Sequence, residues 1–159
     1  MIPSSEDAIL LVAMTANGLL AGVYLAFAVA VSPALRRLDA RIHVQAFASI
    51  NRVIINPVFL TLFFGAPVSA VAAAVTTWTS TTGYVAGIVA AACSLLAFVI
   101  TVTVNVPLNR ALEESDARDD ARALAARARF ADRWDRANAV RAAACLAAVL
   151  TLGWAAVAS

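Results

Sequence analysis

Four long runs of apolar residues define the architecture of this chain. They cover residues 8–31, 57–77, 84–104 and 139–158. Each run is long enough to cross about 30 Å of hydrocarbon as a helix that rises about 1.5 Å per residue. The runs lack the alternation of apolar and polar positions that is typical of barrel strands, and a helix satisfies its backbone hydrogen bonds internally. The pattern therefore predicts an all-α fold, a four-helix transmembrane bundle.

The two longer polar segments, residues 32–56 and 105–138, are predicted to be helical as well. Residues 105–138 are rich in Ala, Arg, Glu and Leu, which are strong helix formers. Nothing in this segment forces a helix to end, so the fourth helix is expected to extend beyond the membrane. Residues 40–52 extend the second helix in the same way, with a kink or restart at Pro57. Residues 1–159 then form a single membrane domain.

Composition supports a membrane location. Hydrophobic residues make up 62% of the chain and charged residues 14%, whereas soluble domains have roughly 45–50% and roughly 25%. The mean hydropathy is +0.83. A chain of 159 residues has too much surface for its volume to bury so many apolar side chains in water. The composition therefore disfavours a soluble enzyme, a nucleic-acid-binding protein and a disordered segment.

The placement of the arginines predicts the orientation in the membrane. All 12 basic residues are Arg, and they lie in or directly beside residues 32–56 and 105–138. The two chain ends and the short link at residues 78–83 contain none. By the positive-inside rule, both arginine-rich segments face the cytoplasm and both termini face outward. We therefore expect a multi-pass protein of the plasma membrane, surrounded by lipid.

The two predicted hairpins contain similar short motifs. Residues 33–38 read PALRRL, and residues 107–112 read PLNRAL. An internal duplication would explain this likeness, and so would chance in a composition this biased.

Polar and aromatic residues recur at helical spacing near the predicted cytoplasmic ends of the spans. Steps of three or four residues place such side chains on one face of a helix. The three faces are His43, Phe47 and Asn51, followed by Asn56, beside the second span; Asn105 and Asn109 at the end of the third; and Trp134, Asn138 and Arg141 at the start of the fourth. In an antiparallel bundle these faces lie at one depth, where they could line a pocket for a flat, hydroxylated aromatic ligand arriving from the lipid.

An alternative interpretation needs no pocket. Asparagine and arginine often cap the ends of membrane helices or contact lipid headgroups, and tryptophan is common at the membrane interface. Asn17 and Tyr24 share a face of the first span, and we interpret them as hydrogen-bonding residues between helices.

The three polar faces, together with the four spans, resemble those of the anthrone-oxygenase-like family of integral membrane proteins. The most specific elements are the sequence NVPLN at residues 105–109 and the pattern W-x3-N-x2-R at residues 134–141. The resemblance extends from about residue 19 to about residue 150. It implies a small membrane protein whose better-known relatives oxidise polyketide anthrones to anthraquinones, in a family that includes many members classified only as a domain of unknown function.

The chemistry of an anthrone is compatible with these side chains. An anthrone is acidic at the carbon opposite its carbonyl, and its carbanion can reduce dioxygen without a metal or a flavin. His43 is the candidate base, because its ordinary pKa lies near neutrality. The amides would stabilise the enolate oxygen and Arg141 would add a fixed positive charge. The candidate catalytic residues are thus His43, Asn105, Asn109, Asn138 and Arg141, and the candidate substrate-binding residues are Phe47, Asn51, Asn56 and Trp134.

The sequence offers no recognisable cofactor site. It has one His, two Cys without partner spacing, and no glycine-rich nucleotide loop. We therefore expect no cofactor, no metal ion and no nucleic-acid partner. The expected ligand is a hydrophobic small molecule, and the sequence leaves open whether the protein forms a homo-oligomer.

Two hypotheses of function follow. The first is a membrane-embedded, cofactor-independent oxygenase acting on a hydrophobic aromatic or polyketide-like molecule. The second is a non-catalytic membrane protein that binds a small hydrophobic molecule or docks a partner. An enzyme requires a cavity between His43 and the asparagine faces, whereas a structural protein would use the amides on one another.

Overall fold

The computed structural model describes residues 4–77, 81–115 and 119–158, and within these ranges all regular structure is helical. Four of the helices are long and apolar enough to span a membrane, which confirms the prediction of an all-α bundle with four spans. Residues 78–80 of the predicted link at residues 78–83 lie outside the described residues, and so does Arg118. The elements are α1 (Ser5–Ala26), the π-helical turn η1 (Phe27–Val31), α2 (Ser32–Arg36), α3 (Ala40–Ile54), α4 (Pro57–Thr76), α5 (Thr81–Ile100), the π-helical turn η3 (Thr101–Asn105), α6 (Val106–Glu113) and α7 (Asp120–Ala158).

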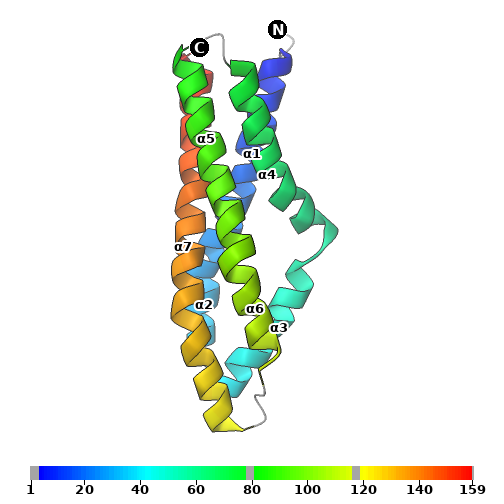
Figure 1. Cartoon of the computed structure of the whole chain (residues 1–159), viewed down its shortest axis with the longest axis vertical. Coiled ribbons are helices and arrows are strands. Elements are labelled where there is room, and N and C mark those ends of the chain that lie inside the picture. The colour runs from blue at the N-terminus through cyan, green and yellow to red at the C-terminus, as the bar shows by residue number, and fades with distance from the viewer. Residues whose placement is uncertain (1–3, 78–80, 116–118, 159) are drawn as a thin grey trace.

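The helices form two antiparallel hairpins, and both chain ends lie at the same end of the bundle (Figure 1). The first hairpin runs from α1 to α4, and the second from α5 to α7. At the opposite end, α2, α3, α6 and residues 120–138 of α7 contain most of the arginines. We call these four segments the arginine-bearing end. At this end, ion pairs join the two hairpins, from Arg36 to Asp132 and Asp135 and from Arg52 to Glu113.

The first helix of each hairpin contains a π-helical turn directly before a proline. The backbone N–H of Ser32 bonds to the carbonyl of Phe27, and the N–H of Val106 bonds to the carbonyl of Thr101. Pro33 and Pro107 follow in the first turn of the next helix. In a regular α-helix a proline ring clashes with the carbonyl four residues earlier. The wider π-helical turn relieves that clash, so the helix continues through the proline. Both turns immediately precede the motif shared by residues 33–38 and 107–112.

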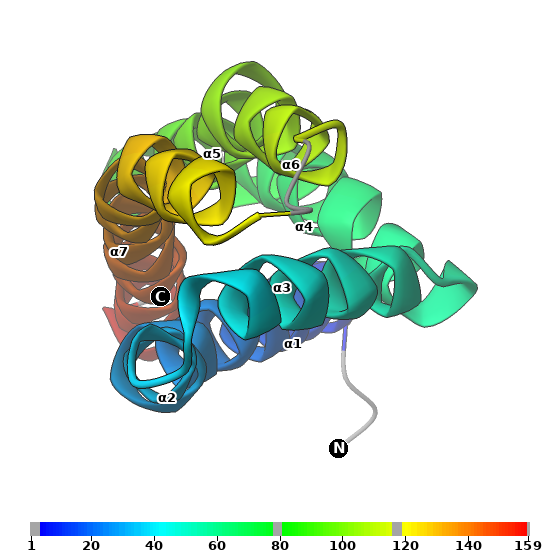
Figure 2. The ribbon, with the colours of Figure 1, turned by 90° about the horizontal axis from the view of Figure 1, so that it is seen from below.

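The returning limbs of the hairpins differ. α7 is one continuous helix of 39 residues, whereas the first hairpin breaks between α3 and α4. Ile55 has φ −77° and ψ 72°, and the N–H of Asn56 bonds to the carbonyl of Ile54 at 2.8 Å, the geometry of an inverse γ-turn. This elbow (residues 55–56) projects to the side of the bundle (Figure 1), and α3 runs across the arginine-bearing end (Figure 2). The helix therefore restarts at Pro57, as the sequence predicts.

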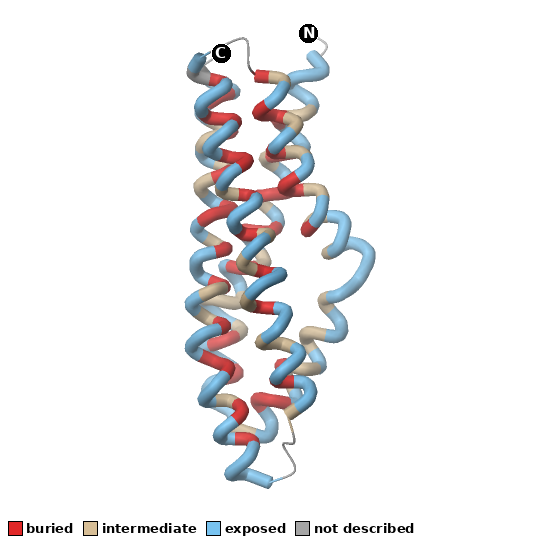
Figure 3. Tube along the Cα trace, viewed as in Figure 1, coloured by how far each residue is buried: buried red, intermediate tan, exposed pale blue. Residues whose placement is uncertain are grey.

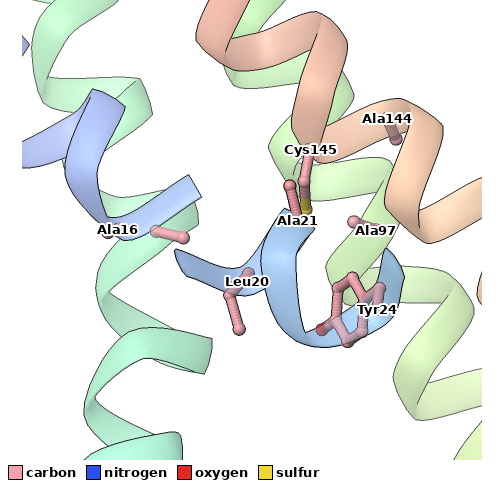
Figure 4. Close-up of a cluster of buried hydrophobic side chains, with 8 residues drawn as sticks. Ala16, Leu20, Ala21, Tyr24, Ala97, Ala144 and Cys145 are labelled. Atoms are coloured by element: carbon pink, nitrogen blue, oxygen red, sulfur yellow. The ribbon is translucent and has the colours of Figure 1, made fainter. Parts of the chain in front are cut away.

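Small side chains let the spans approach closely. A buried cluster joins α1, α4, α5 and α7 (Figure 4) and consists of Ala16, Leu20, Ala21, Tyr24, Ala66, Ala97, Ala144 and Cys145. A Cβ atom added to Gly87 of α5 would lie 2.7 Å from the Cα of Ala74, so α4 and α5 touch backbone to backbone. Such close packing stabilises helix association in lipid. The outward surfaces of the spans are largely exposed (Figure 3) and carry many large apolar side chains, as expected for a surface that faces acyl chains.

Candidate functional site

A cavity of about 90 Å³ lies where the four spans meet the arginine-bearing end. The first hairpin supplies mainly aromatic and aliphatic wall residues: Val23, Tyr24, Phe27, Phe47, Ile50, Ile54, Ile55 and Phe59, together with Asn51. The second hairpin supplies Val106 and the polar or charged groups of Thr101, Asn105, Asn109, Trp134, Asn138 and Arg141.

The cavity brings the three predicted polar faces together. All of the predicted site residues line it except His43 and Asn56. Helical spacing of three and four residues is the feature of the sequence that points to these cavity residues. It identifies the inward face of α3, of η3 and α6, and of α7. The shared depth of the faces follows from the antiparallel arrangement of the helices.

A directional chain of hydrogen bonds links three helices along one wall. The indole Nε1 of Trp134 donates to the Oδ1 of Asn109 at 2.8 Å, and the Nδ2 of Asn109 donates to the Oδ1 of Asn51 at 2.7 Å. Within the described part of the chain, the Nδ2 of Asn51 has no acceptor of its own. The chain of bonds therefore ends in an uncommitted amide donor on a residue that lines the cavity.

Arg141 places a positive charge in the cavity wall. Its side chain is 4% exposed, and its guanidinium carbon lies 4.3 Å from the centre of the Tyr24 ring and 5.5 Å from that of Trp134. Nη1 donates to the hydroxyl of Thr101 at 3.1 Å and Nη2 to the Oδ1 of Asn138 at 3.0 Å. Nε has no hydrogen-bond partner. Stacking on aromatic faces and two neutral acceptors thus hold the guanidinium in place.

Asn138 connects this charge to the first hairpin. It is fully buried, its Oδ1 accepts from Arg141, and its Nδ2 donates to the backbone carbonyl of Tyr24 at 2.8 Å. Tyr24 lies one turn before the π-helical turn η1. The amide therefore aligns Arg141 and fixes the two hairpins at the cavity, and its polar atoms are already engaged by protein groups.

Asn105 is the least satisfied of the buried amides. Its side chain is 1% exposed, and its Nδ2 reaches the backbone carbonyl of Trp134 only at 3.5 Å. Its Oδ1 has no partner. An unpaired acceptor in a buried wall is costly unless a ligand or water supplies a donor. Asn105 is therefore a strong candidate for contact with a bound molecule.

His43 is buried behind the cavity wall and does not line the cavity. Its Nδ1 lies 3.0 Å from the carbonyl of Leu35, so Nδ1 carries the proton, and its Nε2 has no partner. Its ring stacks on that of Phe47, with ring centres 6.2 Å apart, and Phe47 faces the cavity. Burial lowers the pKa of His43 below its usual 6.5, and the nearby charge of Arg127 lowers it further. The imidazole is thus neutral at pH 7 and supports the aromatic wall from outside.

Asn56 lies at the elbow and caps α4. Its Oδ1 accepts from the backbone N–H of Phe59 at 3.1 Å, and its Nδ2 donates to the carbonyl of Val53 at 3.1 Å. Both polar groups of this exposed side chain are therefore used by the backbone, which is a typical role for an asparagine before a helix that begins with proline.

Two polar cavity residues were not among the predicted site residues. The sequence predicts that Tyr24 forms a hydrogen bond between helices, and the structure places its ring over the guanidinium of Arg141. Thr101 accepts a hydrogen bond from the same group. The signal for Thr101 is present in the sequence, because residues 101, 105 and 109 form a single four-residue repeat. Asn17, in contrast, donates to the carbonyls of Ala13 and Ala66, as expected for a residue that joins helices.

Among residues 4–77, 81–115 and 119–158, no group of three His, Cys, Asp or Glu side chains is arranged to hold a metal ion.

Comparison with known proteins identifies one family. The model of the family described as anthrone oxygenase matches residues 47–151, about two thirds of the chain. This range includes every cavity residue that the second hairpin supplies, and it begins after Tyr24 and His43. No curated protein and no solved structure matches significantly.

Proposed function

The chain belongs to the anthrone oxygenase family, and on that premise we propose that it is a membrane-embedded oxygenase. Its substrate is a flat, hydrophobic aromatic molecule of the polyketide type, and its oxidant is dioxygen. The observation that carries the proposal is the cavity itself, in which aromatic walls surround one buried guanidinium and an uncommitted amide donor.

The proposed reaction converts a methylene group of the substrate to a carbonyl. The carbon opposite the ring carbonyl loses one proton, and the resulting carbanion forms a bond to dioxygen. The peroxide anion so formed takes up a proton and becomes a hydroperoxide, and loss of water from the hydroperoxide then leaves a quinone. One oxygen atom is retained and the other leaves as water, so no external reductant is needed.

The cavity residues have distinct roles in this proposal. Arg141 and the Nδ2 of Asn51 stabilise the enolate oxygen, in the manner of an oxyanion hole. Trp134 and Phe47 hold the flat ring system, since aromatic faces stack on aromatic substrates. Asn109 and Asn138 position the donors that touch the ligand, because both are hydrogen-bonded to other site residues. The Oδ1 of Asn105 accepts a hydrogen bond from a hydroxyl group of the ligand.

The orientation of the protein follows from its arginines. We propose that the arginine-bearing end faces the cytoplasm, with both termini outside the plasma membrane, because nine exposed arginines in or directly beside it resist translocation: Arg36, Arg37, Arg41, Arg52, Arg110, Arg122, Arg129, Arg133 and Arg136. The cavity then lies near the inner leaflet.

The substrate reaches the cavity from the lipid. Ile55 and Val106 line the cavity and are also 59% and 44% exposed, so they mark its mouth. Their neighbours Val53 and Val58 are exposed apolar side chains as well. The Asn56 side chain satisfies two backbone groups that flank the elbow, the Val53 carbonyl and the Phe59 N–H, which lowers the cost of placing this segment against acyl chains.

The test is oxygen consumption by the purified full chain with an anthrone, compared with Arg141→Gln and with Arg133→Gln as the matched control. Arg133 is an exposed arginine on the same helix outside the cavity. We expect wild type and Arg133→Gln to consume oxygen above the spontaneous background and Arg141→Gln to lose about 100-fold or more in rate. Equal rates in all three proteins, or no rate above background, would overturn the proposal.

A second candidate function is a non-catalytic binding protein for a small hydrophobic molecule. The bond between Asn51 and Asn109 supports it, because this pair uses two of the amides on each other and joins the hairpins. The two candidates separate in the same experiment, since a binding protein would take up the anthrone without consuming oxygen.

A further inference from the structure

We infer that the cavity binds its ligand as an anion, an aromatic enolate or phenolate whose negative charge is held by Arg141. The inference rests on the proposed function and deepens it, because it specifies the ionisation state in which the aromatic ligand is bound.

Arg141 is a buried cation without a counter-ion. Its two hydrogen-bond acceptors, the hydroxyl of Thr101 and the amide oxygen of Asn138, are both neutral. None of the ion pairs in the described part of the chain includes Arg141; they join Arg36, Arg41, Arg52 and Arg122 to carboxylates of the arginine-bearing end. Among the residues that line the cavity, no side chain is acidic. A buried charge without a partner is costly, so an anion in the cavity gains a large interaction.

The guanidinium has a free donor for that anion. The Nε of Arg141 is buried and has no acceptor, although Nη1 and Nη2 are engaged. The rings of Tyr24 and Trp134 cover the guanidinium and keep water away from it. A charge-assisted hydrogen bond from Nε to an ionised oxygen is stronger in such surroundings than in water.

A second buried atom without a partner indicates which other group the ligand carries. The Oδ1 of Asn105 is an acceptor, buried and without a donor. It fits a hydroxyl group that keeps its proton. The cavity is therefore suited to a flat aromatic molecule with one ionised oxygen and a neutral hydroxyl, not to a fully ionised or a fully apolar one.

Selective binding of the anion changes how the substrate loses its proton. The ligand becomes more acidic when bound, because Arg141 stabilises only its ionised form. For an anthrone, the C–H bond opposite the carbonyl breaks, the proton passes to water, and the electron pair is delocalised onto the carbonyl oxygen. A side-chain base in contact with this carbon is then unnecessary, which agrees with the position of His43 behind Phe47.

A dye at the oxidation level of the product tests this inference without the oxygenase reaction. A monohydroxyanthraquinone absorbs at longer wavelength as phenolate than as phenol, and its methyl ether cannot ionise. With the purified full chain, we expect the pKa of the bound dye to fall by at least about one unit, which means at least tenfold tighter binding of phenolate than phenol. Arg141→Gln should abolish this shift, Arg133→Gln should keep it, and the methyl ether should bind wild type and Arg141→Gln with similar affinity.

The outcomes separate this inference from the proposed function. A bound dye that keeps its solution pKa in wild-type protein overturns the inference, and so does an equal shift in Arg141→Gln. Wild-type protein alone decides the matter if Arg141→Gln fails to fold, because the affinity for the dye must rise with pH while that for the methyl ether stays constant. A shifted dye without oxygen consumption would leave the anion site standing and overturn only the oxygenase; oxygen consumption without a shift would overturn only the anion site.

Discussion

The two hairpins contribute different properties to one cavity. The second hairpin supplies the charge and most of the hydrogen-bonding groups, and the first supplies most of the apolar wall and the elbow at the mouth. Both begin with a helix that contains a π-helical turn before a proline. Their returning limbs differ, because α7 is continuous and the limb formed by α3 and α4 is broken at Ile55 and Asn56.

The difference between the two returning limbs separates the residues that shape the cavity from those that carry its charge. Trp134, Asn138 and Arg141 lie on one unbroken helix, so their relative positions are fixed by its backbone. Phe47 and Phe59 lie on opposite sides of the elbow, so the wall that they form depends on the angle between two helices. Changes in the first hairpin can therefore alter which ligand fits, while the second hairpin keeps the charge in place.

The largest effect is expected from removing the side-chain amide of Asn138 in the continuous helix α7. Asn138→Leu removes the acceptor of Arg141 and the donor to the Tyr24 carbonyl, both within the buried site. We expect the rate of oxygen consumption with an anthrone to fall by about 100-fold, by analogy with loss of an aligned catalytic donor. Asn17→Leu is the control, because Asn17 is equally buried but bonds only to backbone carbonyls away from the cavity. Equal losses in the two variants would contradict a specific role for Asn138.

A smaller effect is expected from narrowing the mouth in the broken limb. Ile55→Trp adds bulk at a residue that is both exposed and part of the cavity wall. We expect KM for the anthrone to rise about tenfold with little change in kcat, the pattern of weakened binding without loss of transition-state stabilisation. Val58→Trp adds the same side chain to the elbow region at a residue that does not line the cavity, and it should leave both constants close to wild type. A fall in kcat with unchanged KM would place Ile55 in the chemistry instead of the access route.

Substitutions of His43 distinguish two roles for this residue, support of the cavity wall and general base in the reaction. Asn at this position can still donate to the Leu35 carbonyl, as Nδ1 does now, but it cannot act as a base. If His43 supports the wall, His43→Asn should keep the rate within about threefold of wild type, whereas His43→Phe, which loses the hydrogen bond, should be less stable by about 1 kcal/mol or more. A loss of activity in His43→Asn, together with loss of an acid-limb inflection in the pH profile of kcat/KM, would support the base hypothesis.

The same residue predicts a pH dependence of stability. The pKa of His43 in the folded protein lies below its value of 6.5 in the unfolded chain. Between these two values the unfolded chain binds more protons, so the free energy of unfolding should fall as the pH decreases through 6.5. Thermal unfolding at a series of pH values should reveal this decrease in wild type and a flatter profile in His43→Asn. Identical profiles would contradict the burial of a neutral imidazole.

The smallest effect is expected at the elbow cap. Asn56→Ala removes the side chain that satisfies the Phe59 N–H and the Val53 carbonyl. We expect the free energy of unfolding to fall by about 1 kcal/mol, the usual contribution of an N-cap. Asn56→Asp keeps an acceptor for the N–H and should recover most of the loss. The rate with an anthrone should change by less than about twofold, and a loss as large as that of Asn138→Leu would return Asn56 to the substrate-binding site.

Much of the site could be predicted from the sequence because helical periodicity converts spacing into direction. Asn105 and Asn109, or Trp134, Asn138 and Arg141, have one direction each once the helix is assumed. The four spans could be predicted for a similar reason, since length and apolarity alone define them.

The remaining features depend on contacts between helices that no local pattern contains. His43 has the same spacing to Phe47 as Asn51 has, yet the crossing of α3 over the bundle turns it away from the cavity. The role of Tyr24 depends on the position of Arg141 in another hairpin. Asn56 carries two local signals, since it is a polar residue near the site and also an asparagine before a proline. In the structure it acts as the second signal predicts, as the N-cap of α4.

The backbone contact between α4 and α5 at Gly87 fixes the distance between these two helices near the end that holds the chain termini. Any side chain at residue 87 would have to push the two backbones apart. Because α4 runs from this contact directly to the elbow, about 26 Å away at about 1.5 Å per residue, one glycine helps to set where the wall of the cavity stands.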